Sequence, residues 1–173
     1  MKVSRLISVA LLLSAIVVFN SGCKEDDPVP LGAETNAKLL AGEPGQSKTW
    51  KLTLGTIQID GGPIQAFGFS ACTLDNLYKF TNNASQDYEA TEGTAKCDPA
   101  DPNLIERGNW AFTLDGEIVI VSSDEIFSGN GLFSYYWLPV PGKVTELTED
   151  SFELELNIND QQTLLVKYTF EKQ

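Results

Sequence analysis

The residue types that most enzymes use for catalysis are largely missing from this chain of 173 residues. It contains no histidine, which removes the commonest general base, the usual zinc ligand and any histidine-activated nucleophile. The sequence also carries no Gly-x-Ser-x-Gly turn, phosphate-binding loop or dinucleotide-binding fingerprint. We therefore predict that the protein is not an enzyme and uses no cofactor.

Carboxylates are abundant, and two adjacent pairs, Asp124-Glu125 and Glu149-Asp150, are the kind of acids that a glycosidase needs. Both pairs fall at predicted turns, where acidic residues are common for solubility alone. Asp98 and Asp101 offer oxygen ligands that calcium accepts, but their loop lacks the spacing and the glycine of a helix-loop-helix calcium site. An acidic turn explains them more simply, and we predict no metal site.

The first residues of the chain predict where the protein resides. Basic residues within 1–5 precede an apolar run over 6–19 and small residues over 20–22, which is the pattern of a secretory signal too short to span a membrane comfortably. A signal that ends directly before a cysteine resembles that of bacterial lipoproteins. The resemblance implies a signal peptide over residues 1–22, lipidation of Cys23 and a membrane anchor made of acyl chains.

The charged residues 24–27 follow the cysteine directly and resemble the export tag of surface lipoproteins in some Gram-negative bacteria. We expect an outer membrane lipoprotein that faces the cell surface, with a periplasm-facing protein as the alternative. Residues 23–38 are expected to form the lipidated tether and the start of a short helix from Ala33 to Ala41, which Gly42 ends. Residues 39–173 then form the folded domain.

If Cys23 is lipidated, Cys72 and Cys97 remain for other roles. An even pair of cysteines in an exported protein predicts a disulfide. The alternatives are two buried free thiols or a metal pair, and the absence of histidine weakens the second. Closing this loop is expected to stabilise the fold by about 3 kcal/mol in the chain-entropy model.

From Thr49 onward, apolar and polar residues alternate with the period of two that is typical of β-strands. A change of phase at Gly55 predicts a bulge there. Asp115-Gly116 predicts a hairpin turn after a face formed by Trp110, Phe112 and Leu114, and residues 122–131 predict a polar loop. The strand-like segments centre on residues 50–59, 78–80, 88–90, 110–114, 118–120, 133–140, 144–147, 152–158 and 164–170.

Eight or nine short strands without long helices between them predict an all-β antiparallel fold. A sandwich and a barrel both fit this pattern. We favour the barrel, because closing the sheet removes its exposed edges.

The order of several short motifs resembles that of the lipocalin-like domains of bacterial surface lipoproteins. The resemblance extends from about Leu39 to Phe170 and implies a calycin-type antiparallel barrel, and Cys72 and Cys97 match the cysteine pair usual in these bacterial domains. The motifs are SKTWKL at 47–52, CTLDNLYKF at 72–80, CD at 97–98, GNWAF at 108–112, ELTEDSFEL at 146–154 and YTF at 168–170.

Aromatic residues are the candidates for ligand binding. A barrel of this size is either filled by its inward-facing side chains or holds one small ligand, and both alternatives stay open here. A second aromatic group lies around a glycine-rich loop and caps the barrel, forms its mouth or presents a contact patch. The inward candidates are Trp50, Tyr78, Phe80, Trp110, Phe112 and Tyr168, and the loop candidates are Tyr136 and Trp137.

A net charge of −12 argues against nucleic acid as a partner. We expect a lipid-anchored binding protein of the cell envelope whose barrel holds a small apolar or amphipathic ligand. The alternative is a surface interaction protein with a filled barrel, whose aromatic loops contact a glycan or an envelope protein.

Overall fold

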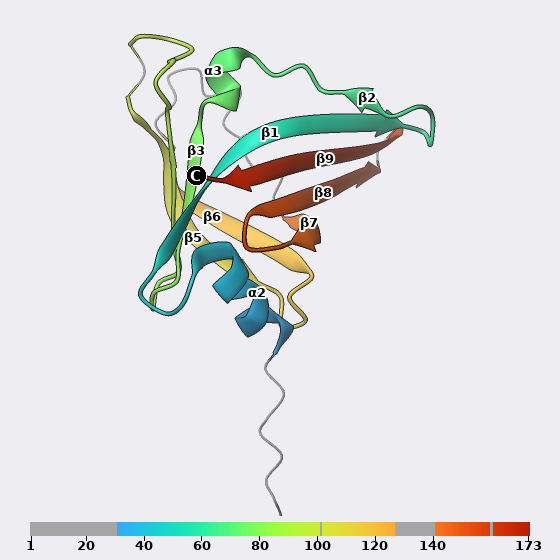
Figure 1. Cartoon of the computed structure of the whole chain (residues 1–173). Coiled ribbons are helices and arrows are strands. Elements are labelled where there is room, and N and C mark those ends of the chain that lie inside the picture. The colour runs from blue at the N-terminus through green and yellow to red at the C-terminus, as the bar shows by residue number, and fades with distance from the viewer. Residues whose placement is uncertain (1–30, 101, 127–140, 160) are drawn as a thin grey trace, which may run out of the picture.

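The described chain folds into a single antiparallel sheet that closes on itself (Figure 1). The computed structural model describes residues 31–100, 102–126, 141–159 and 161–173. Its nine strands follow the order β2-β1-β3-β4-β5-β6-β7-β8-β9, and β1 also pairs with β9. This closure confirms the predicted all-β antiparallel barrel. The short helix predicted before the first strand is also present.

The elements lie close to their predicted positions, and two of them, β2 and α3, were not predicted. The predicted strand over 133–140 lies outside the described residues. The helices are α2 (Gly32–Ala41) and α3 (Ala71–Leu74). The strands are β1 (Ser47–Ile59), β2 (Gln65–Ala66), β3 (Leu77–Thr81), β4 (Asp87–Thr91), β5 (Leu104–Phe112), β6 (Ile118–Ile126), β7 (Gly142–Leu147), β8 (Ser151–Asn159) and β9 (Thr163–Lys172).

Strand β1 closes the barrel because it pairs with the first of the following long strands and also with the last strand of the chain. Residues 47–51 pair with β3, and residues 50–59 pair with β9. The register with β9 shifts between Leu52 and Leu54, so the bulge lies two residues before its predicted position at Gly55. The extra residue reverses the alternation. Leu54, which the alternation placed beside Trp50, is therefore 49% exposed, and Gly55 is buried.

The hairpin of β5 and β6 differs from the prediction at its tip and at its end. Leu114 lies in the turn and is 75% exposed, so it does not continue the face of Trp110. Strand β6 also continues through Ser122 and Ser123, which were predicted to begin a loop. The backbone pairing with β5 extends to residue 126, and it satisfies the hydrogen bonds of this polar segment.

Helix α2 covers one end of the barrel, which we call the helix end (Figure 1). Its residues Ala37, Leu40 and Ala41 are buried in the core. The carbonyl groups of the last helical turn lack partners within the helix. Two side chains of β1 supply them: Trp50 Nε1 donates to the Leu40 carbonyl and Lys48 Nζ donates to the Leu39 carbonyl, both at 2.8 Å. The helix is thus fixed to the strand that closes the barrel.

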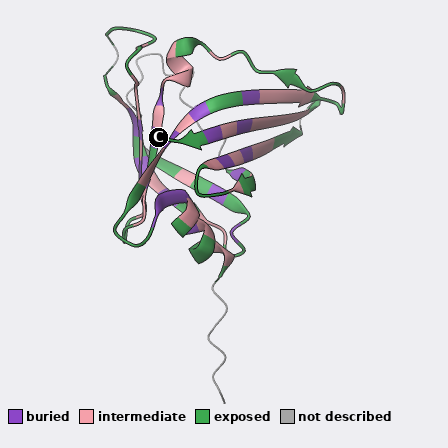
Figure 2. Ribbon diagram, in the orientation of Figure 1, coloured by how far each residue is buried: buried purple, intermediate pink, exposed green. Residues whose placement is uncertain are grey.

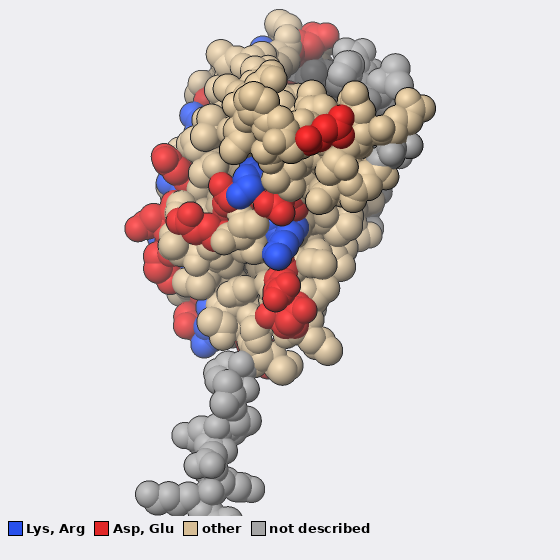
Figure 3. All heavy atoms as spheres, turned by 90° about the vertical axis from the view of Figure 1, so that its right-hand side faces the viewer, with Lys and Arg blue, Asp and Glu red and all other residues tan. Residues whose placement is uncertain are grey.

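The strands separate an apolar interior from a charged exterior, as their alternation requires. On the outer side of β8 and β9, Lys167 Nζ lies 2.9 Å from Glu153 Oε1 and 3.5 Å from Glu155 Oε2. Figure 3 shows acidic and basic side chains intermixed on one face of the molecule, with the acidic ones more numerous. Figure 2 shows that buried positions alternate with more exposed ones along the strands.

Candidate functional site

The inward-facing candidates for ligand binding meet inside the barrel. Trp50, Tyr78, Phe80, Trp110 and Tyr168 are all buried, while Phe112 is partly exposed. Tyr136 and Trp137 lie outside the described residues. The interior is not uniform, because these side chains have different surroundings at the two ends of the barrel.

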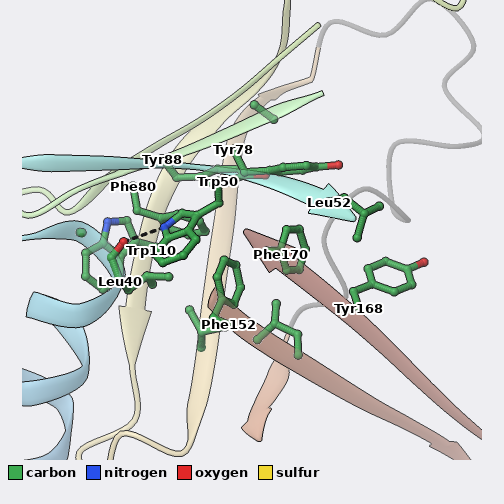
Figure 4. Close-up of a cluster of buried hydrophobic side chains, with 14 of the residues drawn as sticks. Leu40, Trp50, Leu52, Tyr78, Phe80, Tyr88, Trp110, Phe152, Tyr168 and Phe170 are labelled. Atoms are coloured by element: carbon green, nitrogen blue, oxygen red, sulfur yellow. Dashed lines mark hydrogen bonds between the residues drawn. The ribbon is translucent and has the colours of Figure 1, made fainter. Parts of the chain in front are cut away.

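At the helix end, aromatic rings pack directly on one another (Figure 4). Phe152 stacks on Phe170 with ring centroids 4.3 Å apart and meets the edge of Trp50 at 4.9 Å. Phe80 meets Trp110 edge-on at 6.0 Å. We call this group, together with Leu40, the helix-end cluster. Its rings fill the barrel beside α2, so the structure places Trp50, Phe80 and Trp110 in packed core.

Phe112 lies at the outer border of this cluster. Its ring centroid is 5.9 Å from that of Trp110. It also lines a shallow depression of about 400 Å³ beside α2, together with Lys38 and Asn82. Phe112 therefore borders a hollow at the helix end.

The apolar interior continues past the helix-end cluster along β8 and β9. Phe152 pairs with Phe170 and Leu154 with Tyr168, and all four are buried; the next pairs on the same face are Leu156 with Val166 and Ile158 with Leu164. These outer pairs are only partly covered, and Ile158 is 38% exposed. We call this part of the interior, remote from α2, the far end. The inward apolar surface is thus accessible there and buried beside the helix.

An aromatic strap lies beside the far end. Phe67 and Phe69, in the segment between β2 and α3, have ring centroids 6.5 Å and 5.2 Å from that of Tyr168. Gly55 makes this approach possible, because a Cβ atom there would lie 2.3 Å from the ring of Phe69. Figure 4 shows the hydroxyl of Tyr168 pointing away from the helix-end cluster. Apolar rings thus border the accessible part of the interior.

The strap is joined covalently to the loop between β4 and β5. Cys72, in α3, forms a disulfide with Cys97, with the two Cα atoms 5.1 Å apart, which confirms the predicted bridge. Ser70 caps the short helix by accepting a hydrogen bond from the Thr73 backbone N–H. The bridge therefore fixes two segments that lack long strands of their own.

Asp75 holds the same loop by polar contacts. Its Oδ2 accepts hydrogen bonds from the Ala95 N–H at 2.8 Å and from Thr94 Oγ1 at 3.0 Å, and Lys51 Nζ lies 3.3 Å from Oδ1. The backbone hydrogen bond from Ala95 is the largest cause that lowers the pKa of Asp75 to about 2. The carboxylate is thus held in its charged form beside the disulfide.

A carboxylate lies inside the barrel, where the sequence analysis placed none. Glu106 is only 7% exposed; it accepts a hydrogen bond from Tyr88 Oη at 3.2 Å and another from Ser123 Oγ. Burial raises the pKa of Glu106 above its ordinary value, and the two hydrogen bonds oppose that rise. Its spacing from Gly108 and Trp110 on the same strand was a signal that Glu106 faces inward.

Tyr78 differs from every other described residue in one respect. Its hydroxyl oxygen is the only buried side-chain nitrogen or oxygen in the described part of the chain that lacks a hydrogen-bond partner. Burial raises the pKa of this hydroxyl far above its ordinary value, and the charges of Tyr168, Glu106 and Glu92 raise it further. The hydroxyl therefore stays protonated in surroundings that carry acidic groups.

No family model matches the chain, and no curated protein gives a significant sequence match. The described residues contain no helix long and apolar enough to cross a membrane. Within the same residues, no group of three or more histidine, cysteine or acidic side chains is placed to hold a metal ion. The predicted signal peptide over residues 1–22, Cys23 and residues 24–27 lie outside the described residues.

Proposed function

We propose that this protein is a lipid-anchored, non-enzymatic binding protein of the cell envelope, with a lipocalin-like barrel that holds one small amphipathic molecule at the far end. The observation that carries this proposal is the exposure gradient along one inward face of β8 and β9. Leu154 is fully buried, Leu156 is partly covered and Ile158 is 38% exposed. Apolar residues left accessible on a concave inner face are typical of ligand sites.

The helix end is a poor place for the same ligand. Helix α2 covers it, and the rings of Trp50, Phe152 and Phe170 contact one another there. A ligand at that end would have to displace aromatic side chains that contribute most to the core. The far end needs no such displacement.

The sequence supports the place of the protein in the envelope. The lipoprotein-like signal over residues 1–22 and Cys23 implies an acyl anchor, and residues 24–27 resemble the tag of lipoproteins that face the cell surface. The disulfide between Cys72 and Cys97 agrees with this, because such bonds persist in oxidising compartments outside the cytosol.

Filling the far end tests the proposal. The probe is N-phenyl-1-naphthylamine, an apolar dye whose fluorescence rises when it leaves water. We expect the wild type to bind it and Leu156→Trp to lose at least about tenfold in affinity, because an indole would occupy the accessible space. Leu54→Trp is the control, since Leu54 points outward on β1 and is 49% exposed.

Two results would overturn this function: no dye binding by the wild type, or equal binding by Leu156→Trp and the wild type. The filled helix-end cluster favours the second candidate, an interaction protein that contacts a glycan or an envelope protein through the aromatic loop with Tyr136 and Trp137. That candidate predicts the opposite pattern, in which changes in the loop abolish partner capture and Leu156→Trp has no effect.

A further inference from the structure

We propose that the far end of the barrel recognises the hydroxyl group of an uncharged amphipathic alcohol, and that Tyr78 is the residue that binds it. This inference rests on the proposed function and adds to it the chemical class of the ligand. It starts from a buried hydroxyl that has no hydrogen-bond partner among the described residues and that points away from α2 (Figure 4).

A buried polar group without a hydrogen bond is unfavourable, because it has given up its bonds to water and gained none in return. Such groups are rare in folded proteins, and each calls for a specific explanation. Tyr78 Oη is one of them. The ring of Tyr78 does contribute to packing, since its centroid lies 5.5 Å from that of Phe170 in an edge-on contact. A phenylalanine would provide this contact equally well, so packing does not explain the hydroxyl.

Tyr88 is a second buried tyrosine of the same interior, and its hydroxyl has a hydrogen-bond partner. It lies on β4, the strand beside that of Tyr78, and it is equally buried. Its hydroxyl donates to Glu106 Oε2 at 3.2 Å, and Glu106 also accepts from Ser123. Among the described residues, one of these two buried hydroxyls has a partner and the other has none, so an external group could bind the second.

The surroundings of Tyr78 Oη restrict what that group can be. Glu106 lies in the same interior, hydrogen-bonded to Tyr88 at 3.2 Å on the strand beside that of Tyr78. The charges of Glu106 and Glu92 also raise the pKa of the Tyr78 hydroxyl, after the larger effect of burial. They repel a carboxylate or phosphate head group placed beside it. An ammonium group only donates hydrogen bonds and would leave the proton of Tyr78 unused. The oxygen of an alcohol accepts a hydrogen bond from the Tyr78 hydroxyl, and its own O–H can donate to a carboxylate. An alcohol is also uncharged, so the nearby carboxylates do not repel it.

The apolar part of the ligand would lie along neighbouring residues of the far end. Tyr168 lies against Phe69, with ring centroids 5.2 Å apart. Val166 lies two residues before Tyr168 on the same inward face of β9, farther from α2, and it is partly covered. An alkyl chain attached to the alcohol thus finds aromatic and aliphatic surface within the same part of the barrel.

The test compares three head groups on one chain length. Decan-1-ol, decanoate and decylammonium are titrated calorimetrically into the purified full chain, with the naphthylamine dye as a probe that has no hydroxyl. We expect decan-1-ol to bind most tightly. In Tyr78→Phe its affinity should fall about tenfold, the effect of one hydrogen bond in a buried site, and this loss should be larger than any change in dye binding.

Tyr88→Phe is the matched variant for stability, because it removes the same atom from a hydroxyl that has a partner. Without ligand, Tyr88→Phe should lower the melting temperature, whereas Tyr78→Phe should leave it unchanged or raise it. An equal loss in both variants would mean that Tyr78 holds a structural water, and this would overturn the proposal.

The remaining outcomes separate this inference from the proposed function. Equal binding of decan-1-ol by Tyr78→Phe and the wild type, tighter binding of decanoate or decylammonium, or binding of the dye without decan-1-ol would each overturn the alcohol site and leave the ligand-binding barrel intact. Absence of binding by every probe, the dye included, would overturn both.

Discussion

At the helix end, the indole nitrogen of Trp50 is buried and donates to the Leu40 carbonyl at 2.8 Å. The hydroxyl of Tyr78, which points away from α2 (Figure 4), is equally buried and has no partner in the described part of the chain. The two residues face each other in the register between β1 and β3. Their difference separates two uses of aromatic residues in one barrel. Trp50 joins the helix to the sheet, whereas Tyr78 contributes a polar atom that the packing of the core does not require.

The same contrast appears along the strands. Phe152 and Phe170 stack at 4.3 Å beside α2, while Leu156 and Val166, on the same face, are only partly covered. Stability therefore depends mostly on the helix end, where apolar side chains are fully removed from water. The far end contributes less to stability, and this leaves it available for binding.

The largest expected effect comes from shortening one leucine at a time on β8. Leu154→Ala should destabilise the protein by about 2–5 kcal/mol, because it opens a cavity in packed core. Leu156→Ala, two residues further on the same face, should cost about 1 kcal/mol or less, because its side chain is already partly in contact with solvent. Urea unfolding of both variants measures the difference. Equal losses would contradict the distinction between the two ends.

The disulfide should have the next largest effect. Cys72→Ser should lower the free energy of unfolding by about 2–4 kcal/mol, because the bridge closes a chain segment with a sequence separation of 25. Reduction of the wild type with dithiothreitol should lower its stability to that of the variant, as measured by urea unfolding. If the variant and the oxidised wild type unfold at the same urea concentration, the strap does not depend on the bridge.

The smallest effect concerns Asp75, and it disappears in acid. Its pKa is about 2 in the folded protein, against an ordinary value of 3.8. A lowered pKa means that the charged form stabilises the fold above about pH 4, and that this contribution disappears as the pH falls from about 4 to 2. The melting temperature of the wild type should thus exceed that of Asp75→Asn at pH 6, and the two should converge near pH 2.

A constant difference across this pH range would show that Asp75 acts through shape and not through charge. Thr94→Val is a useful control, because it removes one hydrogen bond to the carboxylate and leaves the bonds from Ala95 and Lys51 in place. It should shift the acid transition by less than Asp75→Asn does.

Much of the fold was predictable from local alternation. Tyr78 and Phe80 on β3, Trp110 on β5 and Tyr168 and Phe170 on β9 are buried as the period of two predicted. The prediction failed where the alternation breaks. The bulge between Leu52 and Leu54 reverses the face of β1, and its position depends on pairing with β9, more than a hundred residues away.

The strap and the buried carboxylate were missed for related reasons. Strand β2 has only the residues Gln65 and Ala66 and exists because it pairs with β1. In the sequence, Glu106 resembles any other charged residue. Its two partners, Tyr88 and Ser123, come to lie beside it only when the barrel forms. In both cases the decisive partner lies elsewhere in the chain.

The sequence by itself determined which side chains of β3, β8 and β9 face the interior, because successive residues of a strand point to opposite sides. It also predicted the bridge between Cys72 and Cys97. Only the tertiary structure decided that Tyr88 has a partner in Glu106 and that Tyr78 has none among the described residues. Hydrogen bonds between strands depend on distances and angles that arise when the sheet closes, and no local pattern contains them.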